Sequence, residues 1–299
     1  MVTLIELMLA IGFGTKFADV SAVVRDWRAV VRAGMANYLL VPVAAVVLVL
    51  LFRVQPIVAA GVMVVAVCPG APYSPPFTAL ARGNVAGAVG LMVILAGSSA
   101  LLAPLLLGLL LPLMSKGSRM HVDSASIVRT LVLVQFLPLC VGLAVATWRP
   151  EWARRLTKPA THLSTILGLS LVGTVLIVQF HLLSAIRLRG YIGMLCLLAA
   201  SAAAGWILGG RGAADRTTLA ITTSVRNVGV ALVIAGGSFP GTPAVTFTTA
   251  YAIFQTLVMA LVAIGLGRLG HRGSPTASGC LESDSWSGSA CAARATKDQ

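Results

Sequence analysis

Charged residues are scarce in this chain. Only 10% of its 299 residues are Asp, Glu, Lys or Arg, against about 25% in a typical soluble domain. Hydrophobic residues make up 58%, and the mean hydropathy is +0.93. This composition predicts an all-α polytopic membrane protein in contact with the lipid bilayer, because helices satisfy their own backbone hydrogen bonds in hydrocarbon.

Acidic residues are the rarer charged type, with nine Asp and Glu against 22 Lys and Arg. No nucleic-acid-binding signature accompanies the net charge of +13, so nucleic acid is not an expected partner. The five cysteines form neither a CxxC pair nor a disulfide framework. The apolar runs also contain no paired carboxylates for an intramembrane hydrolase and no His, Cys or Asp cluster with metal-ligand spacing. We therefore expect no catalytic residues, no metal site and no enzymatic activity.

Nine apolar runs predict about nine transmembrane helices. The first run is short for a span of about 20 residues, and the sequence leaves open whether another helix precedes it. Polar loops are expected between the runs, with basic ones at 16–32 and 149–159. Residues 270–299 are rich in Gly, Ser and charge, which predicts a disordered cytoplasmic tail. The nine runs are 2–15, 33–52, 54–81, 85–113, 130–148, 160–186, 190–210, 217–239 and 242–269.

The basic residues between the runs predict the orientation. If residue 1 lies outside, fifteen Lys and Arg fall on the inner side and six on the outer side, with Arg226 left over. Cytoplasmic loops carry the excess of Lys and Arg. We therefore predict a multi-pass protein of the cell membrane with its N-terminus outside and its C-terminus in the cytoplasm.

The third run is interrupted by CPGAPYSPPFTALARGN, residues 68–84. Proline lacks a backbone donor and clashes with the preceding turn, so a continuous helix is not expected here. Broken helices in membrane proteins can aim their ends at a solute, although a proline kink that only shapes the bundle is equally open. The residues assigned to this broken-helix motif are Cys68, Pro69, Gly70, Pro75 and Pro76.

Arg226 lies near the centre of the eighth run, beside Thr222, Thr223 and Asn227. An arginine at a helix centre costs about 2.5–3.5 kcal/mol on insertion scales, so it should face protein, water or a partner. This polar centre predicts a second broken helix that lines a solute site. The alternative is a structural arginine that caps the carbonyls of the broken helix.

CPG followed by ALARGN, with SVRNVGVALVIA in the second half, resembles the bile acid:sodium symporter family over residues 1–269. The resemblance implies a membrane transporter domain of two inverted repeats, in which two broken helices cross at mid-membrane. One repeat would cover about 1–116 and lack one helix, and the other about 119–269. It also implies a secondary transporter that works by alternating access.

The resemblance also places the family's sodium ligands on this sequence. Its Ser-Asn pair falls on Ser74 and Pro75, and two hydroxyl ligands fall on Ala88 and Met92. Its acidic ligand falls on Thr222 and its glutamine on Arg226, whereas an amide is kept at Asn37. Sodium stays possible, but no cofactor is expected, because most of these oxygen ligands are absent.

We therefore predict a transporter of a small organic anion. The expected substrate-binding residues are Arg226, Asn227, Ser74, Thr222, Thr223 and Asn37. Two alternatives stay open: a transport-inactive sensor or scaffold on the same fold, and an arsenite-type efflux carrier that uses Cys68. The substrate, the direction of transport and the oligomeric state do not follow from the sequence.

Overall fold

The computed structural model describes residues 1–114, 123–184 and 186–272. This part of the chain is helical and contains no strand, which confirms the all-α class. Two short π-helical segments, η1 and η2, interrupt longer helices. The elements are α1 (Val2–Gly14), α2 (Phe17–Arg25), α3 (Trp27–Met35), η1 (Ala36–Leu40), α4 (Val41–Leu51), α5 (Pro56–Ala66), α6 (Ser74–Leu80), α7 (Val85–Met114), α8 (Ser124–Leu131), η2 (Val132–Phe136), α9 (Leu137–Trp148), α10 (Pro150–Ser184), α11 (Leu188–Leu208), α12 (Ala213–Ser224), α13 (Val228–Ser238) and α14 (Pro243–Arg272).

Six of the described helices are long and apolar enough to cross a membrane. A seventh would be the pair α1 and α2, which is bent by 83°. The helix α5 is apolar but shorter than a span. The protein is thus a multi-pass membrane protein, while the count of nine and the inverted repeats stay predictions. The six candidate spans are Trp27–Leu51, Val85–Leu113, Ser124–Trp148, Leu188–Leu208, Ala213–Ser238 and Pro243–Arg268.

The prediction of loops at 16–32 and 149–159 was wrong, because both stretches are largely helical. Most of 16–32 forms α2 and the start of α3, and the Asp26 carboxylate caps α3 by accepting from the Ala29 N–H at 3.1 Å. The stretch 149–159 is the polar start of α10. Pro150 occupies the first turn of that helix, where its missing N–H costs nothing. The expected loop at 115–126 lies mostly outside the described residues, as does the tail from residue 273.

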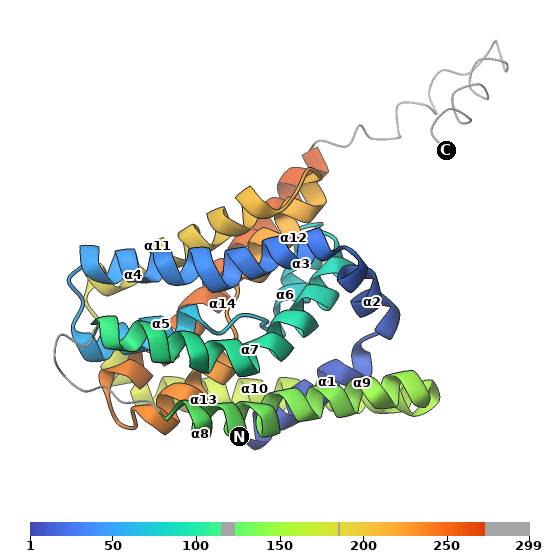
Figure 1. Ribbon diagram of the computed structural model, residues 1–299, viewed down its shortest axis with the longest axis horizontal. Helices are drawn as coiled ribbons and strands as arrows, with labels where there is room; N and C mark the ends of the chain where they lie inside the picture. The colour runs from blue at the N-terminus through green and yellow to red at the C-terminus, as the bar shows by residue number, and fades with distance from the viewer. Residues whose placement is uncertain (115–122, 185, 273–299) are drawn as a thin grey trace, which may run out of the picture.

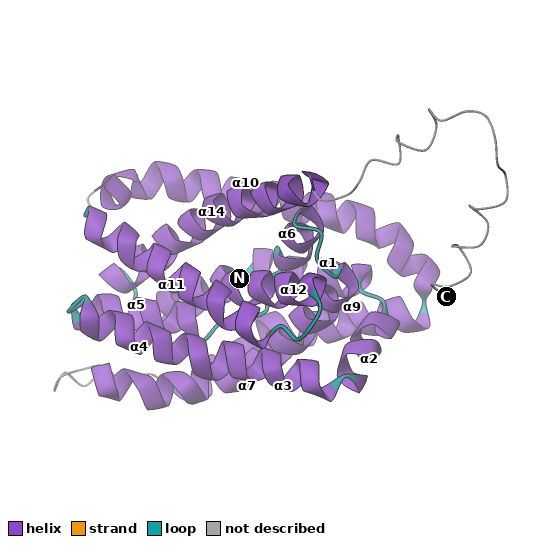
Figure 2. Cartoon of the chain, turned by 90° about the horizontal axis from the view of Figure 1, so that it is seen from above, coloured by secondary structure: helices purple, strands orange, loops and turns teal. Residues whose placement is uncertain are grey.

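The helices run along a common direction in layers (Figure 1). On one side α1 packs against α9 and α10, and these three helices contact one another. On the opposite side α11 packs against α4 and α12. The broken helix α5–α6 packs against α7 and α14, while α12 contacts α6 and α7 and α13 contacts α5 and α14. Figure 2 shows the same bundle from above.

The longest leucine stripe of the chain marks a lipid-facing surface on α7. Four leucines spaced four residues apart are 62–67% exposed, while the opposite face of the same helix is buried. Such an apolar stripe would be unfavourable in water but is the expected surface of a helix in hydrocarbon. The exposed residues are Leu101, Leu105, Leu109 and Leu113.

The contact between α1 and α9 depends on two glycines. A Cβ atom added to Gly12 would lie 2.7 Å from the Cα atom of Gly142, closer than two carbon atoms can approach. Small residues let membrane helices approach until their backbones touch, and the gain is van der Waals packing. This contact joins α1 to the helix that follows η2.

Candidate functional site

The first break separates α5 from α6. The helix α5 ends at Ala66, and Ser74 begins α6 with Pro75 and Pro76 in its first turn. These two prolines therefore start a helix, while Pro69 lies in the non-helical stretch that precedes it. Gly70 has φ +79°, and a Cβ atom there would collide with the backbone of Ala96. Only glycine tolerates this conformation at so close an approach.

The second break separates α12 from α13. The chain leaves α12 after Ser224, and Val225 is extended with φ −81° and ψ 108°. The side chain of Asn227 then caps α13, because its Oδ1 atom accepts from the Val230 N–H at 3.2 Å. The cap satisfies one of the four free N–H groups at the start of a helix.

The two breaks meet, as the sequence predicts. The Asn227 N–H donates to the Cys68 carbonyl at 2.8 Å, and the Asn227 side-chain amide donates to the Gly70 carbonyl at 3.3 Å. Each break therefore supplies partners for the other. This arrangement hides irregular backbone from lipid, where an unpaired group costs several kcal/mol.

The side chain of Arg226 lies inside this crossing and is only 1% exposed. Its Nη1 atom donates to the Oδ1 atom of Asn37 at 3.0 Å. The Nδ2 atom of Asn37 in turn donates to the Ala33 carbonyl at 2.9 Å and to the Thr223 hydroxyl at 3.3 Å. Asn37 belongs to η1, so the π-helical segment presents an amide to the second break.

Gln255 on α14 holds the backbone of Arg226 from the other side. Its Oε1 atom accepts from the Arg226 N–H at 3.0 Å, and its Nε2 atom donates to the Arg226 carbonyl at 2.9 Å. One side-chain amide thus replaces both hydrogen bonds that a continuous helix would give this residue. Gln255 is buried and lies four residues after the buried Tyr251, on the same face of α14.

The charge of Arg226 has no acidic counterpart among the described residues. The ionisable groups that interact with it electrostatically are Tyr251, Cys68 and Tyr38, which are ordinarily uncharged at neutral pH. The Nε and Nη2 atoms of Arg226 are buried without a hydrogen-bond partner in this part of the chain, and so is the Tyr251 hydroxyl. The site is therefore a desolvated cation with unused donors.

The six predicted substrate-binding residues are all buried, but the structure joins only some of them. Arg226, Asn37 and Thr223 form one hydrogen-bonded chain, and Asn227 joins the two breaks. The Ser74 hydroxyl donates to the Ala71 carbonyl just before α6, and the Thr222 hydroxyl donates to the Thr218 carbonyl of its own helix. Neither of these two residues contributes a described hydrogen bond to the Arg226 cluster.

Sequence reasoning missed Gln255 and Tyr251. Both lie in the ninth apolar run, where they are polar side chains at helical spacing within AYAIFQTLVM. That spacing shows that the two share a face of the helix. The spacing does not show that this face points towards Arg226. Gln255 lies 29 residues after Arg226 along the chain.

The positions that the resemblance assigns to sodium do not fit that ion. The side chains of Ala88, Met92 and Pro75 are buried and carry no oxygen. Sodium is a hard cation that takes oxygen ligands, and the buried guanidinium of Arg226 would repel it. No group of three or more His, Cys, Asp or Glu side chains in the described residues could hold a metal ion.

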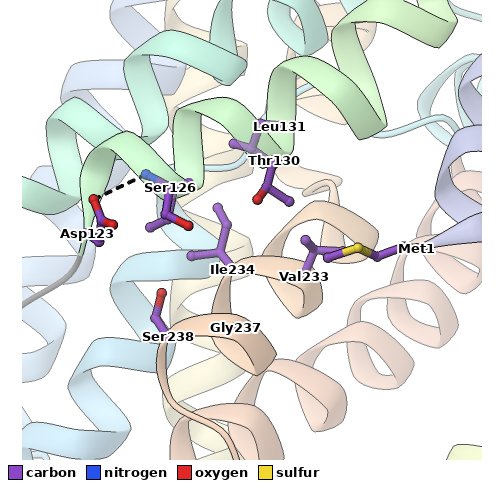
Figure 3. A pocket seen from close by; sticks show the side chains of 10 residues that line it. Met1, Asp123, Ser126, Thr130, Leu131, Val233, Ile234, Gly237 and Ser238 are labelled. Carbon is purple, nitrogen blue, oxygen red and sulfur yellow. Dashed lines mark hydrogen bonds between the residues drawn. The ribbon is translucent and has the colours of Figure 1, made fainter.

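An open cleft of about 280 Å³ lies away from the crossing, between Met1, the start of α8 and the end of α13 (Figure 3). Its wall carries Asp123, whose carboxylate accepts from the Ser126 N–H at 3.2 Å and so caps α8. The remaining lining is a mixture of hydroxyl and aliphatic side chains. The lining residues are Met1, Asp123, Ser126, Ile127, Thr130, Leu131, Val233, Ile234, Gly237 and Ser238.

Interrupted helices that meet at their breaks recur among secondary transporters of the membrane. The model of the Sodium Bile acid symporter family matches residues 1–186. The chain therefore belongs to this family. The match includes the first break and ends before α11, so Arg226 lies beyond it.

A curated relative is the probable sodium/metabolite cotransporter BASS2, chloroplastic, of Oryza sativa subsp. japonica. The two sequences are 27% identical over 173 residues, which is 56% of this chain. The match spans 40% of the relative's length.

Proposed function

We propose that this protein carries a small organic anion across the membrane by alternating access, and that it does so without a sodium gradient. The observation that supports this proposal best is the buried guanidinium of Arg226 at the contact between the two breaks. An uncompensated charge in a low-dielectric interior attracts an anion strongly. Because the guanidinium of Arg226 is permanently charged, it supplies the positive charge that a bound sodium ion would otherwise provide next to the anion.

The proposed architecture is nine spans in two inverted repeats, of about 1–116 and 119–269. Each of the nine apolar runs coincides with a helix or with an interrupted helix. We place the N-terminus outside, because fifteen of the 22 Lys and Arg residues then fall in the inner segments and the tail and six in the outer segments. A cysteine introduced at Arg154 should then react with a membrane-impermeant maleimide only from the cytoplasmic side.

The experiment is uptake into proteoliposomes that contain the purified protein. The probes are radiolabelled acetate, butyrate, benzoate and ethanesulfonate, each measured with an inward sodium gradient and with potassium in its place. We expect saturable uptake of at least one anion, at the same rate with either cation. A rate that rises several-fold with the sodium gradient would refute sodium independence, and no uptake of any organic anion would refute the proposed substrate class.

Arg226→Gln tests the role of the charge. The variant keeps a shorter polar side chain but removes the cation, so anion binding should be lost while the protein still folds. A charge-assisted hydrogen bond is roughly twice as strong as a neutral one. If Arg226 were only structural, the variant would instead melt earlier and bind the anion with unchanged affinity. Melting temperature and affinity should be measured on one preparation.

A further inference from the structure

The free donors of Arg226 lie on one edge of its guanidinium group. Nη1 is engaged by Asn37, whereas Nε and Nη2, which point to the same side of the planar group, have no partner among the described residues. This edge is the fork that binds a carboxylate through two parallel hydrogen bonds. Two unused donors in this arrangement match a planar oxyanion better than they match a spherical ion.

Tyr251 supplies a third donor. Its ring is fully buried and stacks on Phe247, with the ring centroids 6.1 Å apart and an interplanar angle of 25°. Its hydroxyl is buried and unpartnered, and Tyr251 lies one helical turn before Gln255, which bonds to the Arg226 backbone. Buried polar groups nearly always have a partner, so these three free groups require an acceptor that the described protein does not provide.

The surroundings fix these groups in place. Gln255 holds the Arg226 backbone at both its N–H and its carbonyl, and Asn37 holds the far side of the guanidinium. The donors are therefore positioned before any ligand arrives, which lowers the entropy cost of binding. Nothing in this cluster is a hydrogen-bond acceptor aimed at the Nε and Nη2 edge.

We propose that the Nε–Nη2 edge of Arg226 and the hydroxyl of Tyr251 form a buried oxyanion site that binds the carboxylate group of the transported solute. This inference rests on the proposed function and names the chemical group that its site recognises. The site is closed in this conformation, so the carboxylate enters when the packing around the crossing opens. Tyr251 is then a specificity-determining residue, because its single hydroxyl completes the contact with the carboxylate.

The test is ligand-induced stabilisation of the purified full-length protein in detergent. The probes are acetate, its neutral isostere acetamide, methanesulfonate and chloride, titrated at constant ionic strength. Acetate should raise the melting temperature in a saturable way, acetamide should not, and methanesulfonate and chloride should bind more weakly than acetate. Equal stabilisation by acetate and acetamide, or by acetate and chloride, would overturn the carboxylate site without any variant being needed.

Two conservative variants locate the site. Arg226→Lys keeps the charge but removes the fork, and Tyr251→Phe removes only the hydroxyl. Each should weaken acetate binding about tenfold or more, the usual effect of losing a hydrogen bond to a charged partner. Arg129→Lys makes the same change at an exposed arginine of α8 and should leave acetate affinity unchanged.

The outcomes separate this inference from the proposed function. If the wild-type protein transports an anion in proteoliposomes but both variants bind acetate with wild-type affinity, the oxyanion site is wrong and the proposed function stands. If the wild-type protein binds acetate through Arg226 and Tyr251 but takes up no organic anion, the proposed function fails and the site is a static anion site. That second result would also overturn the claim that the site recognises a transported solute.

Discussion

The side chain of Gln255 is the support of the second break, and removing its amide should destabilise the whole bundle. Gln255→Met keeps the length of the side chain and its burial but eliminates both hydrogen bonds to the backbone of Arg226. The substitution would leave the Arg226 N–H without its hydrogen-bond acceptor. It would also remove one of the two hydrogen bonds that the Arg226 carbonyl accepts. The Val228 N–H also donates to that carbonyl at 2.9 Å, so the carbonyl keeps one bond.

The magnitude follows from these two bonds. Leaving a buried donor unsatisfied costs about 1–3 kcal/mol, and an ordinary intramolecular hydrogen bond contributes about 0.5–1.5 kcal/mol. Polar contacts in membrane proteins are weaker on average, about 0.6 kcal/mol, because the unfolded chain in the membrane also finds partners. We therefore expect a loss of about 1–3 kcal/mol, with most of it from the Arg226 N–H.

The assay is thermal unfolding of the purified variant in detergent, beside Gln55→Met as the matched control. Gln55 is exposed and its side chain makes no capping bond at the start of α5, so the same substitution there should be neutral. At roughly 2–4 °C per kcal/mol for a chain of this size class, Gln255→Met should melt several degrees earlier. Equal melting temperatures for the two variants would refute the argument that Gln255 supports the break.

Two further predictions concern helix packing and the contact between the breaks. Gly12→Ala should destabilise the protein by about 1–3 kcal/mol in the same unfolding assay, because the added methyl group meets the backbone of Gly142. Gly193→Ala is the control and should be neutral, because a Cβ atom at Gly193 meets nothing within 4 Å. Asn227→Ala should cost about 1–2 kcal/mol through loss of the α13 cap, and Asn227→Asp should restore most of this stability, because the carboxylate still accepts from Val230. A failure of Asp to rescue the variant would show that the bond to the Gly70 carbonyl matters more than the cap.

The apolar runs were sufficient to place most of the membrane helices, because a span must satisfy a simple requirement of length and hydropathy. The same signal failed at 16–32 and 149–159, where the helices continue beyond the apolar run. Hydropathy marks where the chain leaves hydrocarbon, whereas a helix ends only where its backbone finds another partner. Asp26 and Pro150 were the local signals of helix starts in these stretches.

The candidate site was predictable only in part, for a related reason. Arg226 and the proline-rich break stand out in the sequence because each is costly in a membrane, and an expensive feature in an apolar run indicates a special environment. Gln255 and Tyr251 are less costly and stand out less. Their importance arises from contacts between segments far apart in the chain, which one sequence does not reveal.

The hydrogen bonds at the crossing also bear on the proposed role of Arg226. If the arginine were a cap for broken-helix carbonyls, its guanidinium would donate to the backbone of the breaks. Instead, the Cys68 and Gly70 carbonyls accept from Asn227, and the Arg226 carbonyl accepts from Gln255.

The described bond of the guanidinium goes to the side chain of Asn37. The irregular backbone is therefore supported by neutral groups, and the charge could be removed without leaving these carbonyls unpaired. A desolvated cation without a counter-ion costs several kcal/mol. That cost is compensated when an anion occupies the free edge, so the energetics favour a ligand-binding role over a structural one.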